Sequence, residues 1–72
     1  MYRLSKLQWL AAICYVSGMS FNQVAASLGI SKKAAIGRIN DTRKTLVRQG
    51  SYFNDQISMQ KMFHNNQIQF NK

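Results

Sequence analysis

The sequence contains no proline and no glutamate, and it has one cysteine and one histidine in 72 residues. Because proline is absent, nothing forces a break inside a helix, and we expect an all-α fold. One cysteine excludes an internal disulfide, which suits a reducing cytoplasm, where we expect the protein to be located. Cys14 lies in an apolar segment, His64 stands alone, and Asp41 and Asp55 lack a partner carboxylate. These residues do not form a metal site or an acid–base pair, so we expect no enzyme activity, no metal and no cofactor.

Acidic residues are scarce, whereas basic residues are not. Ten Lys and Arg oppose two Asp, for a net charge of +8, and six of the cations fall between Lys32 and Arg48. Arg38 could pair with Asp41 three residues later, but most of the cations have no possible internal partner. A polyanion is the expected partner, and we favour double-stranded DNA. RNA fits the charge less well, because only Tyr52 and Phe53 lie near enough to stack on bases.

The segment 20–31 has the signals of a short helix followed by a tight turn. Ser20 and Gln23 have the spacing of a capping box, which predicts a helix start. Gly29 follows the apolar residues of this helix, where a glycine of positive φ commonly ends one. Ser31 can then cap a second helix. The pattern is typical of a helix-turn-helix that places its second helix, about residues 31–46, in the major groove of DNA.

The second helix has two different faces at about 100° per residue. The residues expected to face the core are Ala35, Ile39, Thr42 and Leu46. Opposite them lie Lys33, Ile36, Gly37, Asn40 and Lys44, a face that can reach both phosphates and base edges. Base reading is expected from the first four, since Asn pairs with adenine and Lys with guanine, whereas Lys44 is expected to bind phosphate. The complete set of expected DNA contacts is Ser20, Asn22, Gln23, Ser31, Lys32, Lys33, Ile36, Gly37, Asn40, Arg43, Lys44 and Arg48.

From Leu4 to Leu46 the chain resembles the LuxR/GerE-type DNA-binding domain of bacterial response regulators and quorum-sensing activators. The matching elements are Leu4-Ser5, Gly18-Met19-Ser20, Val24-Ala25, Leu28-Gly29-Ile30-Ser31 and Arg43-Lys44-Thr45-Leu46. The resemblance implies four helices, of which the third reads DNA and the fourth often forms a dimer. It also implies a bacterial, plasmid or phage protein. No receiver or ligand-binding domain precedes the motif, so we expect a small stand-alone regulator.

The first expected helix, residues 5–17, is apolar on nearly every side, so both of its faces need a cover. The rest of the chain could supply both covers, or a second copy or another protein could supply one. The expected partner contacts are Trp9, Ile13, Val16, Phe53, Ile57 and Met62. A secretory signal is disfavoured because its cleavage would remove this helix, and the stretch is too short to cross a membrane.

After Gly50 the composition changes to Asn, Gln and scattered apolar residues. We expect a DNA-binding domain over residues 1–50 and a C-terminal helix or tail over residues 51–72. A short fourth helix should begin near Asn54, capped by Ser51 or Asn54, with the chain loosely held from His64 onward. The alternative is a largely disordered polar tail.

These observations predict a small sequence-specific DNA-binding transcriptional regulator that acts as a homodimer. The alternative is an adaptor that docks on RNA polymerase or on a larger regulator.

Overall fold

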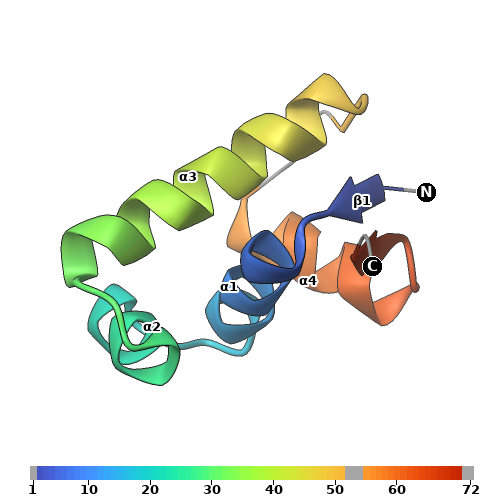
Figure 1. Cartoon of the computed structure of the whole chain (residues 1–72). Helices are drawn as coiled ribbons and strands as arrows, with labels where there is room; N and C mark the ends of the chain where they lie inside the picture. Colours follow the sequence, from blue (N-terminus) through green and yellow to red (C-terminus); the bar gives the residue numbers. More distant parts are fainter. Residues whose placement is uncertain (1, 52–54, 71–72) are drawn as a thin grey trace.

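Four helices and two short strands make up the part of the chain that this computed structural model describes, residues 2–51 and 55–70. In chain order they are β1 (Tyr2–Leu4), α1 (Lys6–Val16), α2 (Phe21–Leu28), α3 (Lys32–Arg48), α4 (Gln56–His64) and β2 (Ile68–Phe70). The fold is therefore mostly helical, as expected. The long helix α3 lies across one side of the molecule, with α2 beneath its N-terminal end (Figure 1). Helix α1 is central, because it packs against α2, α3 and α4.

The two strands form a small parallel sheet that the all-α expectation did not include. Tyr2 pairs with Ile68, Arg3 with Gln69 and Leu4 with Phe70. Leu4 and Ile68 are both buried, so the apolar side chains of the sheet add to the core. This pairing corrects the expectation that the chain is loosely held from His64 onward. The two ends of the described chain consequently lie side by side (Figure 1).

A glutamine side chain occupies the other edge of β1. Gln49, which follows α3, accepts a hydrogen bond from the Arg3 backbone N–H at 2.6 Å and donates one to the Arg3 carbonyl at 2.6 Å. Its amide thus takes the place that a third strand would have. An open strand edge invites pairing with other chains, and this one is closed.

Helix α1 begins with a capping box in which Ser5 and Gln8 bond to each other's backbone N–H. Two small residues on its inner side, Ala11 and Ala12, are completely buried, which allows the neighbouring elements to approach closely. Much of the apolar surface of α1 is therefore covered by the protein's own chain.

Helix α4 begins at a different cap from the expected one. The Asp55 carboxylate accepts a hydrogen bond from the Ser58 N–H at 2.7 Å. Ser51 is not the cap, and the other expected cap, Asn54, lies outside the described residues. Asp55 suits this position because its oxygen can reach the N–H three residues later.

Many of the buried residues belong to one of two clusters. The larger one joins β1, α1, α3, α4 and β2, and consists of Leu4, Ala12, Leu46, Met59, Met62 and Ile68. The smaller one joins α2 to the start of α3 through Val24, Ala25 and Ala35. Because the larger cluster includes α4 and β2, the core crosses the domain boundary expected after residue 50. Over residues 2–51 and 55–70, no helix is long and apolar enough to cross a membrane.

Candidate nucleic-acid interface

The connection between α2 and α3 is only three residues long and is fixed by local hydrogen bonds. The Ser20 hydroxyl accepts from the Gln23 backbone N–H at 3.2 Å, and the side-chain oxygen Oε1 of Gln23 accepts from the Ser20 backbone N–H at 2.9 Å. Gly29 ends α2 with φ 67°, in the left-handed region, and the Ser31 hydroxyl accepts from the Ala34 N–H at 3.1 Å to begin α3. All three sequence signals are confirmed.

The inner face of α3 is the face that the sequence predicts. Ala35, Ile39, Thr42 and Leu46 are all buried. The hydroxyl of Thr42 is satisfied within the helix, because it donates to the Arg38 carbonyl at 2.8 Å. Since this stripe faces the core, the opposite side of α3 is directed to solvent.

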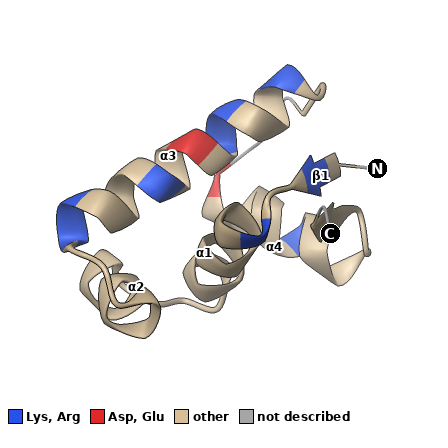
Figure 2. Cartoon of the chain, viewed as in Figure 1, with Lys and Arg blue, Asp and Glu red and all other residues tan. Residues whose placement is uncertain are grey.

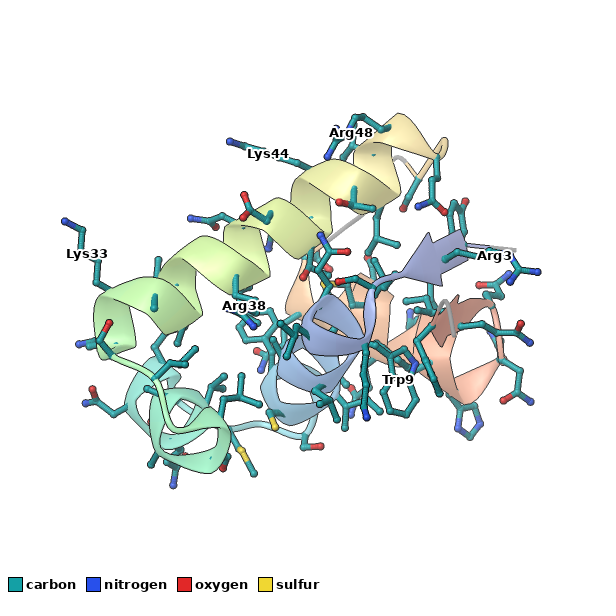
Figure 3. All side chains as sticks on the ribbon, viewed as in Figure 1. Arg3, Trp9, Lys33, Arg38, Lys44 and Arg48 are labelled. Carbon is teal, nitrogen blue, oxygen red and sulfur yellow. The ribbon has the colours of Figure 1, made fainter. Side chains whose placement is uncertain are left out.

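The outer face of α3 carries cations around a glycine. Lys33, Gly37, Asn40 and Lys44 are exposed, and Ile36 on its flank is half-buried. Lys33 and Lys44 extend away from the body of the protein, and Arg48 lies near the end of the same helix (Figure 3). At 1.5 Å per residue, the 17 residues of α3 extend for about 25 Å, which is long enough to cross the major groove.

The cations of this face have no acidic partner among the residues that the structure describes. Among residues 2–51 and 55–70, no carboxylate forms an ion pair with Lys32, Lys33, Lys44 or Arg48. Basic residues recur along α3, whereas α2 has no charged residue (Figure 2). One acidic side chain, Asp41, is exposed on α3. A carboxylate here would repel phosphate but can accept a hydrogen bond from the amino group of cytosine.

The start of α2 offers polar groups beside the same helix pair. Ser20, Asn22 and Gln23 are all exposed. The capping box uses the side-chain oxygen Oε1 of Gln23 and leaves the side-chain nitrogen Nε2 able to donate a hydrogen bond. Donors at a helix N-terminus suit phosphate, because the helix dipole is positive there.

Arg43 does not join the cations of the outer face. Its side chain is half-buried, and its guanidinium donates a hydrogen bond to the Tyr15 hydroxyl of α1. The guanidinium carbon lies 5.3 Å from the centre of the Tyr15 ring. Arg48, by contrast, is exposed, with a long contact of 3.4 Å to the Thr45 hydroxyl.

Three of the six residues expected to contact a partner protein pack against other parts of the chain. Met62 is 8% exposed, and Val16 packs against the larger core cluster. The Trp9 ring contacts Phe63 edge-on, with ring centres 6.2 Å apart, and Phe70 at 4.9 Å. Met62 is therefore covered by the protein's own chain, and Trp9 and Val16 are partly covered by it.

The remaining expected partner contacts have different surroundings. Ile13 is half-buried, Ile57 is 66% exposed, and Phe53 lies outside the described residues. Two exposed apolar side chains were missed: Leu7 at 56% and Val47 at 52%. Leu7 is part of the apolar run of α1, whose outward side could not be identified because the helix is apolar all round.

The described part of this surface holds no group of possible metal ligands. Among the described residues, no three His, Cys, Asp or Glu side chains are grouped so that they could hold a metal ion. Cys14 is a half-buried free thiol that packs against the smaller core cluster.

Comparisons of the chain with protein-family models, with curated proteins and with solved structures found no match. The features that favour a nucleic-acid partner are the arrangement of α2 and α3 and the cations of α3.

Proposed function

We propose that the protein is a small sequence-specific DNA-binding regulator of transcription that inserts α3 into the major groove. The observation that carries the proposal is the outer face of α3, where exposed Lys33, Asn40 and Lys44 surround Gly37 while the opposite face is buried. Lysines can bind phosphate or guanine, and an asparagine can form two hydrogen bonds with adenine.

In this proposal α2 and α3 are a helix-turn-helix, and the chain is a relative of LuxR/GerE-type domains. The short connection through Gly29 and the two capped helix starts support that interpretation. The residues proposed to contact phosphates from α3 are Lys32, Lys33, Lys44 and Arg48. Asn22 and Gln23 would hold the start of α2 against the DNA backbone. A homodimer would place two copies of α3 on half-sites about one helical turn apart.

The test is selection of bound duplexes from a random-sequence pool at two salt concentrations. The expected result is an enriched motif, palindromic or tandem for a dimer. If the protein retains duplexes in a salt-dependent way but enriches no motif, sequence-specific reading is contradicted and only nonspecific phosphate binding remains.

Asn40→Ala then tests base reading directly. We expect it to weaken binding to the enriched duplex by about 1–3 kcal/mol and to leave binding to random duplexes almost unchanged. Gln60→Ala, a change at an exposed residue of α4, is the matched control and should alter neither. An equal loss on both kinds of duplex would remove Asn40 from the base-reading residues.

The second candidate function is an adaptor that docks on RNA polymerase or on a larger regulator. Exposed Leu7 and Ile57 favour it, because exposed apolar side chains can serve a protein contact. Sedimentation analysis, read together with the duplex selection, distinguishes the regulator from the adaptor. A dimer that dissociates when Ile57→Ser is introduced supports the regulator. A monomer that selects no DNA motif supports the adaptor.

A further inference from the structure

Tyr15, near the C-terminal end of α1, contacts residues from the three other helices. Its hydroxyl accepts a hydrogen bond from Arg43 of α3. Its ring stacks on Phe21 of α2, with ring centres 5.9 Å apart and planes 10° from parallel. Its backbone carbonyl accepts a hydrogen bond from the Gln56 side chain of α4 at 2.6 Å. This residue is therefore the point where all four helices are joined.

Arg43 uses its side chain on this residue in two ways. The guanidinium donates to the hydroxyl and also lies 5.3 Å from the centre of the aromatic ring. A planar guanidinium can bond at its edge and interact with an aromatic ring, which a lysine ammonium cannot do equally well. The arginine lies on α3 between exposed Asn40 and Lys44, so its anchoring fixes the part of α3 that carries them.

We propose that Tyr15 and Arg43 are a positioning pair: they set the orientation of α3 relative to α1, and Arg43 affects DNA binding through Tyr15 and not by contact with phosphate. The inference rests on the proposed function, because the surface that the pair orients is the proposed DNA-reading face. It gives Arg43, which was expected to contact DNA, a role inside the protein, because its half-buried side chain is bonded to Tyr15.

A second polar contact between the same helices supports this role. The Gln8 side chain of α1 donates to the Thr45 hydroxyl of α3 at 3.0 Å. Two separate attachments resist rotation of one helix on another, whereas a single attachment permits it. The Tyr15 attachment is the one that α2 and α4 also hold in place.

Tyr15→Phe is the decisive variant, because it removes only the hydroxyl and keeps both the ring and the backbone carbonyl. We expect it to lower the affinity for the selected duplex by about three- to tenfold, the usual consequence of losing one intramolecular hydrogen bond. The slope of affinity against salt concentration should not change, since no phosphate contact is lost. Tyr2→Phe, which removes a tyrosine hydroxyl from β1, is the matched control and should bind as the unmodified protein does.

Arg43→Lys and the variant that carries both changes complete a double-mutant cycle with Tyr15→Phe. Arg43→Lys should lose at least as much affinity as Tyr15→Phe, because it also weakens the contact of the guanidinium with the ring. The double variant should lose no more than Arg43→Lys alone, since both changes break the same hydrogen bond. If Arg43 binds phosphate instead, Arg43→Lys would keep most of the affinity and Tyr15→Phe would be silent. That result would overturn the inference.

The same cycle in the free protein separates the inference from the proposed function. Each single variant should lower the melting temperature by about 5 °C, and the double variant should show no additional loss. Additive effects would overturn the pair, whether or not the protein binds DNA. If the losses in melting temperature are non-additive but the protein binds no DNA duplex, the contact between Tyr15 and Arg43 is upheld and the proposed function alone is overturned.

Discussion

Gly37 should be replaceable by alanine with a gain in stability. It lies inside α3, and a Cβ atom added there would meet no atom within 4 Å. Alanine is favoured over glycine in a helix interior by about 0.8–1.0 kcal/mol, with no steric cost to subtract at this position. The free energy of unfolding should therefore rise by about 1 kcal/mol, which raises the melting temperature of a domain of this size by about 5 °C.

The same substitution should weaken DNA binding. Gly37 lies on the outer face of α3, together with Lys33 and Lys44. A methyl group there would stand between the helix backbone and the groove. Forcing an extra carbon into a close contact costs about 1–3 kcal/mol, so the affinity should fall at least about fivefold.

Circular dichroism melting and fluorescence anisotropy on the selected duplex measure the two effects separately. Gly29→Ala is the control for stability, because Gly29 has φ 67° and alanine in that conformation costs about 1–2 kcal/mol. It should lower the melting temperature while Gly37→Ala raises it. A Gly37→Ala protein that is more stable and binds DNA as well as before would refute the close approach of DNA to α3 at this residue.

Three further predictions concern charge, pH and the strand edge. Lys44→Ala should reduce the salt slope of DNA binding by about 1, whereas Lys61→Ala on α4 should not change it; an unchanged slope would exclude Lys44 from the phosphate contacts. The Ser58 N–H and hydroxyl hold the pKa of the Asp55 carboxyl below its ordinary value of 3.8, so its contribution to stability is present above about pH 4 and is lost as the pH falls through the lower folded-state pKa. Asp55→Asn should keep the cap and remove that part of the pH dependence, which thermal melts between about pH 2 and pH 6 would detect; an unaltered profile would count against it. Gln49→Ala should open the edge of β1, lower the free energy of unfolding by about 1 kcal/mol and increase self-association in sedimentation analysis; a monomer of unchanged stability would contradict the edge-closing role.

Features that depend on near neighbours in the chain could be predicted from the sequence. The Ser20–Gln23 capping box, the turn at Gly29 and the Ser31 cap each involve residues three or four positions apart. The buried stripe of α3 was also predictable, because its apolar residues recur at helical spacing over 17 residues.

Features that depend on distant contacts could not be predicted. β1 and β2 are three residues each, too short for a periodic pattern, and each strand needs the other as its partner. Arg43 is adjacent in sequence to Lys44, and both were expected to face DNA. The position of Tyr15 in the folded chain decides between them, and no pattern within α3 contains that information.

The parallel pairing of β1 with β2 also constrains the order of folding. Its partners come from opposite ends of the described chain, so their pairing closes a loop that contains nearly every other residue. Closing a loop of this length costs about 4 kcal/mol of chain entropy. The contacts of α1, α2 and α3 span shorter separations and should form earlier. The sheet is then the final step, and a nascent chain that lacks Ile68 would already hold α1, α2 and α3 together while one side of Leu4 and Met59 remained open to chaperones and proteases.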